Sequence, residues 1–292
     1  MYRLKELDKE ILKIRIELEK TSNKELRKIL LEQKKQLEKT RELIGSLYME
    51  YGENLHMSDV EKFNARRKIE VELKETHNRL TSFEMGVLGG LLYQGYKEGY
   101  YKTAYTIDKG ISIGINYKVL RKEFIDAVVN ANFEGQNFSN RIWQNKEWVV
   151  NQLYNTIGKG IYEGTSVNKL GKEIKDIFGS SAYQSKRLVN TELARIVTLA
   201  QDQIYKDSGV VNKVMWTATL DDHTCGECGN YDGKIFDVED STKPMPPIHP
   251  NDRCCYIPVV EGWSPKTRRE QSTKSNIDYV TYNEWKEKDN ID

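Results

Sequence analysis

The sequence predicts an α+β fold, in which a long helical region comes before a small antiparallel β module. Leucine and isoleucine recur three and four residues apart through the N-terminal part of the chain, as on one face of a helix. After Gly209 the residues become rich in β-formers. All four cysteines fall between Cys225 and Cys255, where a bound metal could hold a small β module together.

Residues 1–110 are expected to form helices that each carry one narrow apolar seam. A turn and an antiparallel helical hairpin are predicted near Ser22–Asn23, because Ser22 and Glu25 form a capping box and the seam changes register there. The first seam consists of Leu4, Leu7, Ile11, Ile14 and Leu18, and the second of Leu26, Leu30, Gln33, Leu37, Ile44 and Leu47.

A third helix is predicted after Ser58, which forms another capping box with Glu61. Narrow seams of this kind have two interpretations, since one stripe on each helix cannot build a deep core. The helices either pack on one another, or they form an arm that binds a partner. An arm made of residues 1–50 would project from the globular part and become ordered against that partner.

Four glycines, at positions 86, 90, 95 and 99, recur on a tyrosine-rich stretch of predicted helix. A glycine costs about 1 kcal/mol at a helical position, so its recurrence needs a reason. Close approach of another helix explains the spacing best. Stacking of the tyrosines on nucleic acid is the alternative.

Residues 111–209 are predicted to complete the helical part. The helix that precedes the β module should end at Gly209, because glycine is favoured just after a helix C-terminus. A turn at 132–143 brings Phe138, Arg141 and Trp143 together, either as internal framework or as a partner contact. Helices are expected at about 146–163, 167–178 and 182–208.

Residues 210–262 are predicted to form the β module. Strands are expected over 210–219 and 234–238, with a tight Asp-Gly turn between them at Asp232–Gly233. Residues 263–292 are expected to be a flexible polar tail.

A metal site is predicted at Cys225, Cys228, His249 and Cys254. Two thiolates two residues apart can hold one side of Zn²⁺, and a returning segment can supply two more ligands. Cys254 is preferred to its neighbour Cys255, because adjacent residues of a strand point to opposite faces. We predict a structural zinc, since four protein ligands leave no open position for catalysis. Thiols without a metal are the alternative.

Composition and motifs argue against several classes of function. The 45 basic and 44 acidic residues give a formal net charge of +1, which does not indicate a blanket polyanion-binding surface. No apolar run reaches the ~18–20 residues that span a bilayer, and the charged N-terminus has no signal region. We therefore expect a protein that is kept in a reducing cytoplasm or packed into a particle built there. No nucleotide-binding, zinc-protease or serine-hydrolase motif occurs, so no catalytic residue is predicted.

Two further groups of residues have ordinary interpretations. His223 stands beside acidic residues in a polar loop and is expected to be solvated rather than catalytic. Glu192 and Arg195 lie three residues apart on a predicted helix, which is the spacing of a salt bridge.

Several motifs of the C-terminal half follow one another in a specific order. Residues 187–195 hold a long-helix motif, residues 216–228 a Trp-to-Cys-x-x-Cys segment, residues 231–236 an Asp-Gly hairpin, and residues 247–254 a closing His-Pro-x-x-Arg-Cys. Together they resemble the phage head morphogenesis domain of the Mu F-like type. Residues 137–143 are similar to a motif of minor head proteins from phages of Gram-positive hosts.

The sequence also departs from that family. Asn190 and His223 stand where arginine is usual, Asp252 occupies a position that is often cysteine, and Cys255 is additional. These departures leave the exact set of metal ligands open.

The resemblance implies a structural role, and because no arrangement of residues looks like a working NAD site, no enzymatic activity is predicted. Such a protein would be a minor capsid protein of the virion, made in the host cytoplasm and placed inside the capsid during procapsid assembly. The phage portal protein is the expected partner, with capsid or scaffold proteins and phage DNA as further contacts, and without a membrane span or a small-molecule substrate.

Two other functions stay open. The family's fold is thought to be related to ADP-ribosyltransferases, so an enzyme of that kind is one alternative. A zinc module that binds nucleic acid is the other. It would need a contiguous basic face, whereas Lys and Arg alternate with Asp and Glu along this sequence.

Overall fold

Long helices dominate the computed structural model, which describes residues 7–111, 114–260, 265–270, 273 and 275–289. They divide between two units, each built from segments that are distant in sequence. The first, called the sheet unit, comprises residues 1–22, 91–129 and 190–292. The second, called the bundle unit, comprises residues 23–90 and 130–189. Three helices pass from one unit into the other: α1 (Leu7–Tyr51), α2 (Asp59–Ile111) and α5 (Val167–Ser208).

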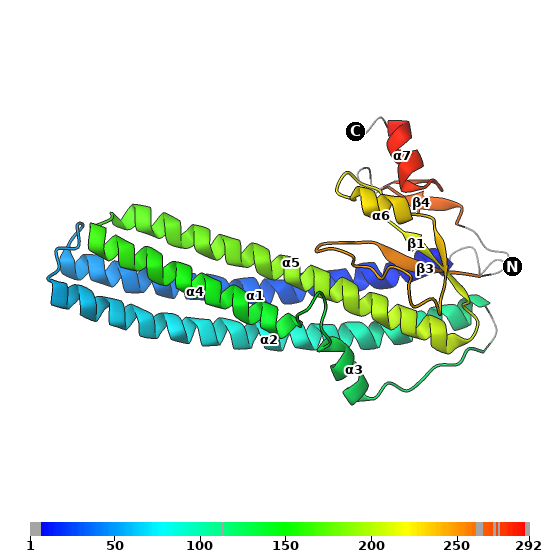
Figure 1. The fold of residues 1–292 in the computed structure, drawn as a ribbon, viewed down its shortest axis with the longest axis horizontal. Helices are drawn as coiled ribbons and strands as arrows, with labels where there is room; N and C mark the ends of the chain where they lie inside the picture. The colour runs from blue at the N-terminus through cyan, green and yellow to red at the C-terminus, as the bar shows by residue number, and fades with distance from the viewer. Residues whose placement is uncertain (1–6, 112–113, 261–264, 271–272, 274, 290–292) are drawn as a thin grey trace. The chain divides into compact units, whose positions relative to one another are not determined.

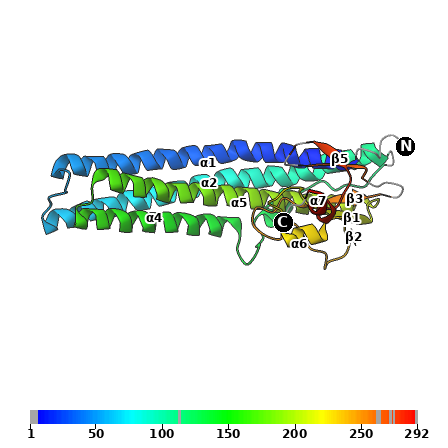
Figure 2. The ribbon, with the colours of Figure 1, turned by 90° about the horizontal axis from the view of Figure 1, so that it is seen from above.

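The bundle unit is built from four helices: parts of α1, α2 and α5 together with α4 (Phe138–Glu163). These run side by side in both views of the ribbon (Figures 1 and 2). Apolar side chains repeat three and four residues apart on each helix, so each buries one face. The resulting core includes Ile69 and Leu73 on α2, Leu153 and Ile157 on α4, and Ile174 on α5.

The helix ends of the bundle follow local sequence signals. The capping box predicted at Ser58 is confirmed, since its backbone N–H donates to Glu61 at 2.7 Å and its hydroxyl accepts from the Glu61 N–H at 3.4 Å. Asn137 accepts from Asn140 at 2.9 Å and begins α4. Gly164 ends it in the left-handed conformation, at φ +62°, which glycine adopts without strain.

The turn predicted near Ser22 is wrong, because α1 continues unbroken to Tyr51. The shift of the apolar seam has another cause: residues before Asn23 belong to the sheet unit and later ones to the bundle unit, so different neighbours cover the helix. The hairpin turn lies instead at 52–58. The helix α5 also runs without the break expected after residue 178.

The seam at the start of α1 is buried within the sheet unit. Leu7, Ile11, Ile14 and Leu18 are all at most 5% exposed, while Leu4 lies outside the described residues. Arg15 on the same helix donates to Gln201 at 3.0 Å. These residues support the interpretation that the helices pack on one another, and the described part of α1 forms no separate projecting arm.

Two of the four recurring glycines allow a close helix approach in the sheet unit. A Cβ at Gly95 would lie 2.8 Å from Leu193, and one at Gly99 would lie 3.2 Å from Ala200, both on α5. Gly86 and Gly90 face open space. Close packing therefore explains only half of the pattern.

The sheet unit contains a three-stranded antiparallel sheet of order β2-β1-β3. The central strand β1 (Lys213–Thr217) pairs with β2 (Ile235–Asp237) and with β3 (Cys255–Val259). Its residue Met215 lies opposite Ile235 on one side and Ile257 on the other. The predicted change from helix to a small antiparallel sheet after residue 209 is thus confirmed.

Residues 263–292, expected to be a flexible tail, contain further secondary structure in their described part. These are β4 (Thr267–Arg269), β5 (Asn276–Asp278) and α7 (Tyr282–Asp289). Arg268 holds this region in place by donating to both carboxylate oxygens of Asp232 and to the Val280 carbonyl at 2.9 Å. Because a bidentate pair has two parallel hydrogen bonds, it fixes orientation as well as position.

The consecutive blocks expected from the sequence, divided at residues 110, 209 and 262, do not follow the two units. Of these boundaries, the one at 209 coincides with the end of α5 at Ser208. Among the described residues, no helix is both long and apolar enough to cross a membrane.

A buried ion pair lies inside the bundle unit. The Lys146 ammonium is 2.6 Å from the Glu84 carboxylate, and both side chains are at most 1% exposed. Ser185 joins them by donating to Glu84 at 2.9 Å and accepting from Lys146 at 3.0 Å. The pair therefore lies among polar partners from α2, α4 and α5, where removal of one charge would leave the other without its counter-ion.

We expect Lys146→Met to reduce the free energy of unfolding by about 3–5 kcal/mol, since it strands a buried carboxylate. The double variant Lys146→Met/Glu84→Leu should recover most of that loss, because no charge then stays buried. Lys159→Met is the control on the same helix, as its exposed pair with Glu163 spans 3.9 Å. Urea unfolding measures all three, and a single variant no less stable than the double would contradict the account.

Candidate metal centre

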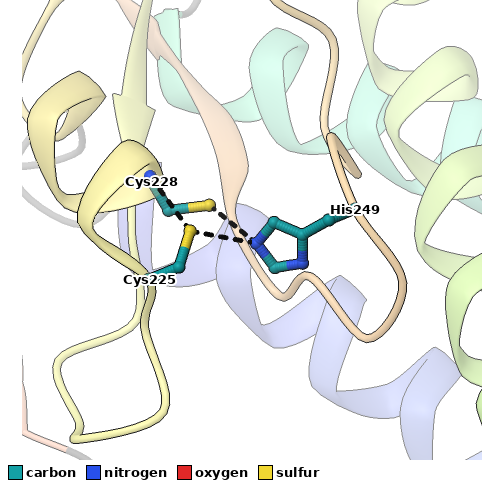
Figure 3. A group of neighbouring side chains, drawn as sticks. All are labelled: Cys225, Cys228 and His249. Carbon is teal, nitrogen blue, oxygen red and sulfur yellow. Dashed lines mark hydrogen bonds between the residues drawn. The ribbon is translucent and has the colours of Figure 1, made fainter.

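Cys225 and Cys228 lie at the start of a short helix, α6 (Gly226–Tyr231). Cys225 is its N-cap residue, and its sulfur accepts the backbone N–H of Cys228 at 3.4 Å. The helical turn thereby places both sulfurs on the same side, toward the loop that carries His249 (Figure 3).

His249 approaches the two cysteines from that loop. Its Nε2 lies 3.2 Å from the sulfur of Cys225 and 3.2 Å from that of Cys228. Its Nδ1 lies 3.1 Å from the Pro250 carbonyl, so a proton on Nδ1 can be donated there. Nε2 then presents its lone pair to the sulfurs, which is the arrangement of a metal-binding histidine.

A second group shares Cys228. The sulfur of Cys228, a carboxylate oxygen of Asp252 and the sulfur of Cys254 all lie within 4.8 Å of one another, and all three residues are buried. Asp252 also organises the loop, since it accepts the backbone N–H of Ile248 at 2.9 Å and of Cys254 at 2.8 Å. Sequence reasoning did not include Asp252 among the candidate metal ligands. Its position in the family motif, which is often cysteine, was a signal that it could be one.

Cys255 lies outside both groups in the described part of the chain. It is the first residue of β3, and burial raises the pKa of its thiol. The four residues predicted from the sequence are therefore brought together in two overlapping groups, and Cys255 is not among them.

The donors suit a soft divalent cation such as zinc. Tetrahedral zinc with Zn–S of about 2.3 Å and Zn–N of about 2.0 Å separates its ligand atoms by roughly 3.5–3.8 Å. The sulfur–nitrogen distances of 3.2 Å are close to that separation. A hydrogen bond from Cys254 lowers the pKa of Cys228, while the same bond and burial raise the pKa of Cys254. A bound cation would lower the pKa of both thiols.

The motif residues around this centre hold its loops in place. Thr191 on α5 accepts the backbone N–H of Asn251 at 3.0 Å. Arg253 binds both carboxylate oxygens of Asp221, at 2.6 and 2.8 Å. These contacts connect the long-helix motif, the segment before Cys225 and the closing loop.

The residues considered for other chemistry have structural roles. The expected salt bridge between Glu192 and Arg195 is present at 2.8 Å and is buried. Arg195 also donates to the carbonyls of Val128 and Val129 at the end of α3 (Lys122–Val129). The side chain of His223 is 79% exposed, as expected of a solvated residue.

The C-terminal residues cover the short helix α6. Sequence reasoning predicted neither this helix nor its contact with the C-terminal residues. Tyr282 donates its hydroxyl proton to the Thr224 carbonyl at 2.8 Å. Its ring lies so close to Gly229 that a Cβ there would be 2.2 Å from a ring carbon. Tyr282 and Trp285 also form a small apolar cluster with Leu220 and Val280.

Comparison with known proteins agrees with this set of motifs. Residues 151–257 match the family described as Phage Mu protein F like protein, so this part of the chain is similar to that family. The predicted resemblance is confirmed over this range, which contains the four C-terminal motif segments. The similar segment at 137–143 lies outside it.

Two curated relatives extend the comparison. The chain is 22% identical over 269 residues to the minor head protein of Bacillus phage SPP1, covering 85% of this chain and 87% of that protein. It is 28% identical over 204 residues to an NAD(+)–arginine ADP-ribosyltransferase of Enterococcus faecalis, covering 65% of this chain. It spans only 42% of the length of that transferase. No solved structure matches the chain significantly.

We expect Gly229→Ala to destabilise the sheet unit by about 1–3 kcal/mol, because the added methyl group overlaps the Tyr282 ring. Gly226→Ala is the matched control in the same short helix, since a Cβ there meets no atom within 4 Å. Thermal unfolding of both variants should show a lower midpoint for Gly229→Ala alone. Equal midpoints would mean that Tyr282 does not pack on α6.

Proposed function

We propose that this protein is a structural component of a tailed-phage head, incorporated near the portal during procapsid assembly. The observation that carries the proposal is the similarity to the SPP1 minor head protein, which extends over 85% of this chain and 87% of that protein. A match along nearly the whole of both chains supports a shared role better than a match to one domain. On this proposal the protein lies inside the capsid of the virion and contacts the portal protein, with capsid or scaffold proteins and phage DNA as further partners.

The arrangement of the motif residues supports a structural role. Glu192, Arg195, Asp221 and Arg253 each bind one another or the backbone, so their pairing has a structural explanation. A protein whose specific residues hold loops and helices together needs rigidity more than reactivity. The proposal therefore assigns no catalytic residue to the chain.

Zinc is proposed as a structural cofactor held by Cys225, Cys228, His249 and Cys254. The two overlapping groups of donors that share Cys228 support this set. Asp252 holds the loop by accepting the backbone N–H of Cys254. A bound ion would cross-link α6 to the closing loop and stabilise the fold of the small β module. With four protein ligands it would have no open position for a substrate.

An ADP-ribosyltransferase activity is the second candidate, favoured by the Enterococcus relative. The alignment covers 42% of that protein, so its name alone does not carry the activity to this chain. A pocket of about 360 Å³ in the sheet unit is lined by Arg253, Arg268 and Glu19. Arg253 is paired with Asp221, and Arg268 is paired with Asp232. Glu192, the acidic residue of the long-helix motif, is only 1% exposed. Hydrolysis of NAD by the pure protein, abolished by Glu192→Ala, would favour this candidate instead.

We expect purified protein to carry about one zinc per chain, measured by elemental analysis after dialysis without chelator. Cys228→Ser should lose the zinc and loosen the β module, since Cys228 belongs to both donor groups. Helicity should persist in Cys228→Ser, because the bundle core contains none of these residues. Cys255→Ser is the matched control and should keep its zinc. A metal-free protein with an intact β module would refute the site.

We expect Trp143→Ala to lower the copy number of the protein in purified procapsids. Trp143 belongs to the segment that is similar to minor head proteins, and it is 45% exposed although its ring makes an edge-to-face contact with His77. Trp148→Ala is the control, since Trp148 lies on the same helix and is also 45% exposed. Quantitative mass spectrometry of particles compares the two variants with the unchanged protein. Unaltered incorporation of Trp143→Ala would place the docking contact elsewhere.

A further inference from the structure

One face of α1 in the bundle unit is predominantly basic over residues 23–35. Between residues 23 and 35 the exposed positions hold five basic residues, one asparagine, one leucine and no acidic residue. The basic residues are Lys24, Arg27, Lys28, Lys34 and Lys35, and the other two are Asn23 and Leu31.

The two acidic residues of this segment are less exposed than the basic ones. Glu32 is buried and binds Arg79 of α2. Glu25 is partly buried and pairs with Lys28 at 2.6 Å. In this segment the helix therefore presents mainly basic side chains to solvent, because positions three and four apart share a face.

Four of the five basic side chains on this face have no carboxylate within 4.0 Å among the described residues. Lys28 is the exception, through its pair with Glu25. The whole chain has a formal net charge of only +1, so this local concentration of charge is not a property of the average surface. At 1.5 Å per residue, the face extends for about 16 Å from Lys24 to Lys35.

We infer that this face of α1 binds the phosphate backbone of double-stranded DNA without sequence preference. Duplex DNA carries one charge per ~1.7 Å of its axis, so a stripe about 16 Å long can follow a row of phosphates. Flexible lysine and arginine side chains suit such contacts, since backbone binding needs charge and reach rather than fixed geometry.

Other occupants fit the face less well. A membrane surface is bound by helices that also present a broad apolar face, and Leu31 is the only large apolar residue exposed between 23 and 35. A tight protein interface is anchored by buried aromatic residues, and this stretch has none. The inference rests on the proposed position in a DNA-filled head, but it is tested by DNA binding itself.

The test is fluorescence anisotropy of the full chain with a labelled 30-base-pair duplex of arbitrary sequence, at a series of salt concentrations. Lys24→Gln/Arg27→Gln/Lys34→Gln should weaken binding at least about tenfold at low salt. It should also reduce the slope of log affinity against log salt by about 2–3, because each lost phosphate contact removes about 0.9. Circular dichroism checks that the helices persist.

The matched control is Lys68→Gln/Lys169→Gln/Lys172→Gln, which removes the same charge from exposed positions on α2 and α5. It should stay within about twofold of the unchanged protein, since the three lysines lie off the basic face. Equal loss in both triple variants would overturn the inference in favour of a net-charge effect. So would absence of DNA binding, or stronger binding to phosphatidylserine vesicles than to DNA. Copy number in procapsids tests the proposed function separately.

Discussion

The carboxylate of Asp252 holds the loop on which the candidate metal centre depends. By accepting the backbone N–H groups of Ile248 and Cys254, it closes a tight turn around His249. A buried carboxylate is stable there because two backbone donors satisfy it. The loop is then fixed to α5 by Thr191 and to the segment before α6 by Arg253. Position and orientation of the histidine follow from these bonds, and the cysteines of α6 meet it only because the loop has this shape.

The same bonds explain why the motif residues occur together. Asn251 adopts φ +63°, a conformation that asparagine tolerates better than most residues, and its N–H reaches Thr191 from there. Asp221 and Arg253 form a bidentate pair between segments 32 residues apart. The motifs are thus parts of one hydrogen-bonded framework in the sheet unit, and a similar order of motifs in another chain implies a similar framework.

Much of this site could be predicted from the sequence, because its signals are local. The Cys-x-x-Cys turn, the histidine loop and the preference for Cys254 over Cys255 each depend on a few adjacent residues. The small sheet and the end of α5 at Ser208 were predictable for the same reason. What could not be predicted depends on partners far away in the chain. Arg268 looks like any charged residue of a polar tail until Asp232 is seen beside it.

The helices show the same limit. Lys146 has the sequence surroundings of an exposed residue, yet Glu84 of another helix brings it into the core of the bundle unit. The continuity of α1 past Ser22 could not be predicted, because a shift in the apolar seam is also the pattern of a turn between two helices. Nothing in Ser22 or Asn23 prevents a helix; the shift reflects a change in the residues that cover it.

A helix that contributes residues to two units restricts where the chain can gain or lose residues. Each residue of a helix turns the chain by about 100°, so one residue inserted in the middle of α1 would rotate everything after it by that angle. The seam could then stay in phase with one unit only, and the residues of the other would face outward. Substitutions along α1, α2 and α5 can be absorbed one at a time. Insertions and deletions near the unit boundary are tolerable only in steps that restore the helical phase, about 7, 11 or 18 residues.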